Sequence, residues 1–206
     1  MVTEWLVVHD GLMGAARFPS LVRSQRRVSS AELLLLVACG AAAAVAVGFV
    51  KLSLRIPGHA ITLAVLPMAL GLSLAPRRLA GSLMGASALG TASFLTAVSG
   101  VTYGAGAIVS LSLLGPMMDV ALRGAGSGWR VYLALVLSGT VANLLALGSR
   151  AAAKLLGLDL VGARPFDSWW LQALGTYTVS GVVAGLLGAL CWFHFNDRSG
   201  QRRTQA

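Results

Sequence analysis

Long apolar stretches alternate with short polar stretches along most of this chain. A transmembrane helix needs about 20 mainly apolar residues to cross roughly 30 Å of hydrocarbon. Six stretches approach that length, at 31–50, 60–76, 79–98, 106–122, 131–149 and 170–195. The pattern predicts an all-α integral membrane protein, folded as a six-transmembrane-helix bundle. It divides the chain into an amphipathic, basic segment at 1–30, a transmembrane domain at 31–195 and a basic tail at 196–206.

The composition agrees with a membrane protein. Of the 206 residues, 56% are hydrophobic and only 11% are charged, whereas soluble domains have about 25% charged residues. The two cysteines, Cys39 and Cys191, both fall within apolar stretches. There they are better explained as small apolar packing residues than as a disulfide framework.

Basic residues alternate between the two sides of the predicted bundle. Eleven of the sixteen Lys and Arg residues lie on one side, namely Arg17, Arg23, Arg26, Arg27, Arg77, Arg78, Arg123, Arg130, Arg198, Arg202 and Arg203. The other side has Lys51, Arg55, Arg150, Lys154 and Arg164. Positive residues near span ends stay cytoplasmic, so we expect a multi-pass protein of the cytoplasmic (inner) membrane with both termini inside. The same rule explains the net charge of +9 without a nucleic acid partner, which would need basic residues on one face.

The predicted spans are rich in glycine and alanine. Small residues four positions apart let helix backbones approach closely, and Gly81–Gly85 and Gly181–Gly185 fit this spacing. We therefore expect a tightly packed bundle. The first span has small residues to spare, which predicts a face for a partner helix at Ala38, Ala42 and Ala46.

Two prolines, Pro67 and Pro116, lie inside predicted spans. Proline removes a backbone hydrogen bond and kinks a helix. Such broken helices often line transport sites, but kinks are also ordinary in membrane bundles, and both interpretations stay open.

Polar and aromatic residues gather at the predicted outer ends of several spans. The candidates for a substrate site are Arg55, His59, Tyr103, Asn143, Trp169 and Tyr177. Arg55 and His59 would favour an anionic or hydrogen-bonding ligand, and His59 is also a candidate metal ligand. The structural alternatives are an aromatic belt for Trp169 and an ordinary loop position for His59, because no metal-binding cluster occurs in the sequence.

Other polar groups have structural explanations. Asp119 precedes Arg123 by four residues, so the two can pair on one helix face. The sequence has no phosphate-binding loop, nucleophile motif or paired carboxylates. We therefore expect neither an enzyme nor a bound cofactor.

One region resembles a known family. The matching elements are Ile56-Pro57-Gly58-His59, Thr62-Leu63, Leu66-Pro67, Leu74-Ala75-Pro76 and Gly81-Ser82-Leu83-Met84-Gly85. They resemble the first loop and the next two helices of energy-coupling-factor (ECF) transporter substrate-capture (S) subunits. The cobalt/nickel branch is most similar, through Gly58-His59 and the glycines at 104 and 106. That branch begins with Met-His, whereas this chain begins Met1-Val2-Thr3, so only His59 corresponds to a metal ligand.

The resemblance implies a subunit that captures a small molecule, a vitamin or a metal ion, from outside. It would dock through its first helix on a transmembrane coupling subunit, and ATPases in other chains would supply the energy. The alternative is a non-transporting membrane scaffold whose Gly/Ala faces hold partner helices. A channel ranks last, because the spans have too few polar residues for a continuous path.

Overall fold

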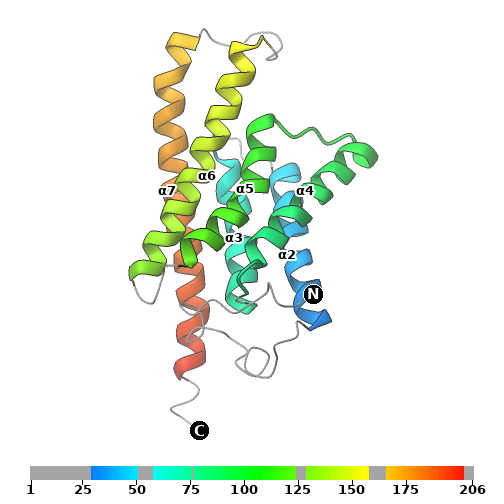
Figure 1. The fold of residues 1–206 in the computed structure, drawn as a ribbon, viewed down its shortest axis with the longest axis vertical. Coiled ribbons are helices and arrows are strands. Elements are labelled where there is room, and N and C mark those ends of the chain that lie inside the picture. Colours follow the sequence, from blue (N-terminus) through cyan, green and yellow to red (C-terminus); the bar gives the residue numbers. More distant parts are fainter. Residues whose placement is uncertain (1–28, 51–57, 76, 124–128, 158–165, 202–206) are drawn as a thin grey trace.

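The computed structural model describes residues 29–50, 58–75, 77–123, 129–157 and 166–201, and these contain helices but no β-strand. The helices are α2 (Ser30–Phe49), α3 (Ala60–Leu74), α4 (Ala80–Ser99), α5 (Ala105–Leu122), α6 (Trp129–Leu155) and α7 (Phe166–Gln201). They form a bundle in which the chain runs alternately up and down (Figure 1). Within the described residues the all-α prediction is therefore confirmed.

Five of these helices, all except α3, are long and apolar enough to cross a membrane. This supports a multi-pass membrane protein. Helix α3 has 15 residues, a length of about 22 Å at 1.5 Å per residue, which is shorter than the hydrocarbon core. The sequence predicted a membrane span at 60–76, the second of six, and α3 does not reach that length. It ends at Leu74, because Pro76 disfavours helical backbone in the residue before it, Ala75.

Helix α3 is apolar because it is enclosed by protein. It packs mainly on α7 and α2, and also on α5. Six of its side chains are completely buried, namely Ile61, Ala64, Val65, Met68, Ala69 and Leu72. Hydropathy reports only that a side chain avoids water, so burial inside a bundle and exposure to lipid give the same sequence signal.

Glycines let the helices approach closely, as the sequence predicted. A Cβ added at Gly81 would collide with the backbone of Gly115, which joins α4 to α5. A Cβ at Gly139 would lie 2.6 Å from the carbonyl oxygen of Gly181, which joins α6 to α7. Both small-residue pairs noted in the sequence are thus used inside the molecule, where a larger side chain would force the backbones apart.

In Figure 1 the C-terminal ends of α2, α4 and α6 and the N-terminal ends of α3, α5 and α7 lie toward the top. We call this the upper end of the bundle and the opposite one the lower end. Helices α6 and α7 extend above the others at the upper end (Figure 1). Helix α7 also continues to Gln201, past the predicted end of the last span at 195, because hydropathy marks the apolar part of a helix rather than its last turn.

Buried charges are compensated at the lower end. Arg77 Nη2 lies 2.9 Å from Glu32 Oε2, and both side chains are 3% exposed. The carboxylate of Asp119 accepts hydrogen bonds from the backbone N–H groups of Gly81 and Ser82, at 3.0 and 2.7 Å. The sequence assigned Asp119 to a pair with Arg123, which is exposed. In the structure Asp119 instead caps the first turn of a distant helix, α4, a contact that helix spacing alone does not predict.

Candidate ligand-binding site

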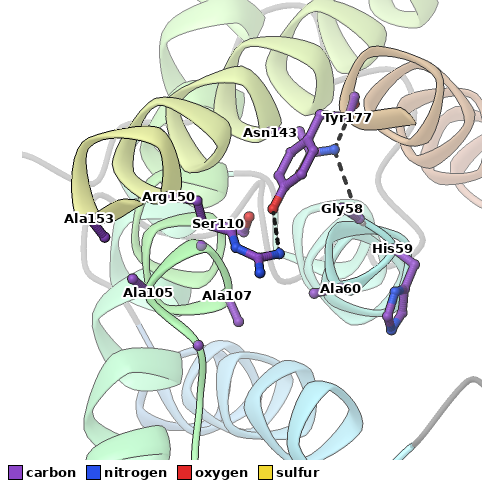
Figure 2. A pocket seen from close by; sticks show the side chains of 12 residues that line it. Gly58, His59, Ala60, Ala105, Ala107, Ser110, Asn143, Arg150, Ala153 and Tyr177 are labelled. Carbon is purple, nitrogen blue, oxygen red and sulfur yellow. Dashed lines mark hydrogen bonds between the residues drawn. The ribbon is translucent and has the colours of Figure 1, made fainter. Parts of the chain in front are cut away.

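A cavity of about 250 Å³ lies at the upper end, between the N-terminal ends of α3 and α5 and the facing parts of α6 and α7 (Figure 2). Ligand sites usually have volumes of about 300–1,000 Å³, so this cavity suits a small molecule. Its walls combine glycine and alanine with a few polar side chains. The lining residues are Gly58, His59, Ala60, Gly104, Ala105, Gly106, Ala107, Ser110, Asn143, Arg150, Ala153 and Tyr177.

Asn143 connects three elements around the cavity. Its Nδ2 group donates to the carbonyl oxygen of Tyr177 on α7 at 2.7 Å and, more weakly, to that of Gly58 before α3 at 3.4 Å (Figure 2). Both partners are acceptors, so they fix which end of the amide is nitrogen. The remaining atom, Oδ1, is buried and has no hydrogen-bond partner among the described residues. A buried acceptor of this kind is rare in folded proteins.

Gly58 allows the chain to approach Asn143 and Tyr177. Its φ angle is +88°, a conformation that residues with a Cβ rarely adopt. An added Cβ would lie 3.1 Å from Asn143 Nδ2 and 3.1 Å from Tyr177 Cγ. Glycine at this position therefore sets where α3 begins and brings its first turn to the cavity wall.

Arg150 supplies positive charge to the cavity. Its Nη1 group donates to the hydroxyl of Tyr177 at 3.3 Å (Figure 2), and no described carboxylate lies within ion-pair distance of the guanidinium. The side chain passes Gly106, where an added Cβ would lie 3.1 Å from Arg150 Cδ. Arg150 is half-buried, so its charge faces the cavity without full exposure to solvent.

Two helices begin at the cavity wall. The N-cap residues are His59 for α3 and Gly104 for α5, and neither makes a side-chain capping hydrogen bond. The first N–H groups of a helix have no acceptor within that helix, and the helix dipole places partial positive charge there. Together with Arg150, these two ends give the cavity a positive potential. Phosphate and carboxylate groups bind at such positions.

The structure brings together only some of the site residues that were predicted from the sequence. Asn143 and Tyr177 are in contact at the cavity, and His59 also lines it. In Figure 2 the His59 ring points away from Arg150 and Tyr177. Within the described part of the chain no group of three or more His, Cys, Asp or Glu residues could hold a metal ion. Arg55 lies outside the described residues.

Two nominated aromatic residues lie elsewhere. The Tyr103 hydroxyl donates to the carbonyl oxygen of Ala44 at 3.0 Å, so it attaches the segment before α5 to α2. Burial raises the pKa of this phenol. Trp169 packs against Trp170 with ring centroids 6.5 Å apart, and Lys154 Nζ lies 5.1 Å from its ring. Neither aromatic residue lines the cavity, nor does Pro67 or Pro116.

Sequence reasoning missed Arg150 and Ser110 as site residues, and it noted Gly106 only in the family resemblance. Arg150 was counted only as a charge that sets orientation. It follows Asn143 by seven residues, however, which is about two helical turns, so both side chains lie on one face of α6. That spacing was available in the sequence. Ser110 is 3% exposed and lines the cavity from α5. Nothing in the sequence marked it, because a serine within an apolar helix commonly bonds only its own backbone.

The predicted docking face on α2 is divided. Ala38 and Ala42 are exposed and Ala46 is half-buried, whereas Cys39 and Ala43 on the adjacent face of the helix are buried. Comparisons of the chain with family models, curated proteins and solved structures gave no match. The functional argument therefore depends on the geometry of the site and on the sequence pattern.

Proposed function

We propose that this protein is the membrane-embedded substrate-binding subunit of an uptake transporter, and that it captures a small molecule in the cavity between α3, α5, α6 and α7. One observation carries the proposal. A cavity lined by alanine, glycine and a few polar side chains lies at one end of the bundle, beside a buried amide oxygen that has no partner among the described residues. Buried polar atoms without partners cost free energy. A substrate that donates a hydrogen bond to this oxygen would offset that cost while it is bound.

The cavity faces outward in this proposal, and the protein lies in the cytoplasmic membrane with both ends of the chain inside. The distribution of arginine supports this orientation. To test it, Cys39 and Cys191 are replaced by alanine and single cysteines are introduced at exposed positions. Ser99→Cys, at the upper end, should react with an impermeant maleimide added to intact cells. Arg78→Cys, at the lower end, should react only after lysis, and the reverse pattern would contradict the orientation.

The partners proposed are a transmembrane coupling subunit and ATPases supplied by other chains, as in ECF transporters. Exposed Ala38 and Ala42 on α2 support a helix-docking surface, since small residues allow close approach. Ala42→Leu should prevent co-purification of the coupling subunit while leaving ligand binding intact. Ala152→Leu, a matched change at an exposed position of α6, should affect neither.

Ligand capture is tested by binding to the full chain in lipid nanodiscs. A panel of small anions, neutral solutes, cations, vitamins and divalent metals is screened by thermal stability and then by calorimetry. At least one compound should raise the melting temperature, and Ala107→Leu, which fills the cavity wall, should abolish the rise. If no compound of any charge class stabilises the protein, the capture function is wrong.

The second candidate, a non-transporting scaffold, is favoured by the exposed small residues of α2. It predicts that Ala42→Leu alone removes function in cells and that Ala107→Leu has no effect. Capture predicts that Ala107→Leu removes uptake while the protein stays assembled with its partners.

A further inference from the structure

From the chemistry of the cavity we infer that the ligand is a small carboxylate that also carries a hydroxyl or amino group. This inference deepens the proposed function and depends on it. It selects an organic anion over the metal ion that the sequence resemblance suggested. Three observations lead to it: the sign of the charge in the cavity, the unpartnered Asn143 oxygen, and the size of the walls.

The charge in the cavity selects an anion. Arg150 is the only residue among the described lining that is permanently charged, and no Asp or Glu is in that lining. The N-terminal ends of α3 and α5 add partial positive charge at the same place. A divalent metal ion would meet repulsion from all three groups and would find no carboxylate or thiolate among the described walls. A carboxylate would gain charge-assisted hydrogen bonds from Arg150 and from backbone N–H groups.

Asn143 selects a second group on the ligand. Both described bonds of Asn143 use Nδ2, and Oδ1 stays without a partner in a residue that is 1% exposed. Only a donor satisfies this oxygen, so an anion that is purely an acceptor leaves it unpaired. A hydroxyl or amino group on the same ligand would donate a hydrogen bond to this oxygen. Ser110, whose hydroxyl has no partner among the described residues, can bond the same group or the carboxylate.

The walls limit the size and total charge of the ligand. The cavity has a volume of about 250 Å³, and four alanines line it: Ala60, Ala105, Ala107 and Ala153. Their methyl groups suit a short carbon chain and offer no compensation for a second negative charge. A singly charged carboxylate is easier to transfer from water into such a site than a phosphate dianion.

The test uses three probes of matched shape on the full chain in nanodiscs. Lactate has both groups, propionate lacks the hydroxyl and lactamide lacks the charge. Glycolate, hydroxybutyrate, glycine and serine extend the series in size and donor type, and nickel and cobalt chlorides represent the metals. The best hydroxy or amino acid should bind about tenfold to a hundredfold more tightly than its counterpart without the donor, as expected when a buried acceptor is left unpaired. Its uncharged counterpart should bind more weakly still.

Variants assign the effect to the cavity. Arg150→Gln should remove the preference for carboxylates over amides, and Arg150→Lys should keep part of it. Lys154→Gln is the matched control, because it removes the same charge one turn further along α6, from a residue that packs on Trp169 instead of lining the cavity. Asn143→Leu should make the donor-bearing probe and its counterpart bind equally, provided that circular dichroism shows an intact helical fold.

Two results would overturn the inference. One is equal loss of carboxylate binding in Arg150→Gln and Lys154→Gln, which would place the anion outside the cavity. The other is tight binding of a solute that lacks a carboxylate, or of a metal, that Ala107→Leu abolishes. That result would agree with ligand capture but would refute the inference that the ligand is an anion. Absence of binding by every class of compound would refute both proposals together.

Discussion

The two ends of this bundle treat helix N-termini differently. At the lower end the first turn of α4 receives a carboxylate from the protein itself, because Asp119 accepts bonds from Gly81 and Ser82. At the upper end the first turns of α3 and α5 meet at a cavity, and no described side chain caps them. The contrast shows how one physical element serves two purposes. A helix end with its own anion stabilises the fold, whereas one that faces a cavity is available to an anion from outside.

The largest loss of stability should come from a substitution at the lower end of the bundle. Glu32→Ala leaves Arg77 buried without its acidic partner, and removal of one member of a buried pair typically costs about 3–5 kcal/mol. Thermal unfolding in detergent measures the loss. The double change Glu32→Leu with Arg77→Met removes both charges and should restore most of the stability. If Glu32→Ala unfolds at the wild-type temperature, the pair contributes nothing to the fold.

Replacement of the Asp119 carboxylate should destabilise the protein less than Glu32→Ala does. Asp119→Asn replaces one acceptor oxygen with a donor that faces backbone N–H groups, and we expect about 1.5–3 kcal/mol of destabilisation. Added carboxylates in solution should not restore it, because Asp119 is 1% exposed and its place is closed. Restoration by a soluble anion would contradict the contrast between the two ends.

Gly58 tests the geometry at the upper end. Gly58→Ala forces a Cβ into left-handed backbone, at a cost of about 1–2 kcal/mol, and crowds Asn143 and Tyr177. Stability should fall by that amount and ligand binding should fall with it. Gly104→Ala is the control for the stability measurement, since an added Cβ there meets no atom within 4 Å, and it should unfold within about 0.5 kcal/mol of wild type. Equal behaviour of the two variants would mean that α3 does not begin as described.

The smallest change in stability should come from Arg150. Arg150→Gln removes a half-buried charge with no described acidic partner, so the unfolding free energy should change by less than about 0.5 kcal/mol. Anion binding should nevertheless be lost. A large loss of stability without ligand would show that Arg150 supports the fold in the way that Asp119 does, and the contrast between the ends would disappear.

Some features of the candidate site could be predicted from particular residues. Asn143 and Tyr177 drew attention because an amide and a phenol within apolar spans need hydrogen-bond partners. The seven-residue spacing between Asn143 and Arg150 also places both on one face of α6. Nothing local showed that Tyr103 would bond Ala44 rather than face the cavity. The direction of a loop side chain depends on which helix lies beside it.

The sequence by itself determined the all-helical fold class, the places of the long apolar helices and the close glycine contacts, because hydropathy and residue size act over one or two helical turns. Only the tertiary structure decided that α3 is a short central helix, that Asp119 caps α4, and that Arg150 joins Asn143 and Tyr177 around one cavity. Each of these depends on helices that are distant in the chain. Their contacts are selected by the packing of whole faces, which no local pattern records.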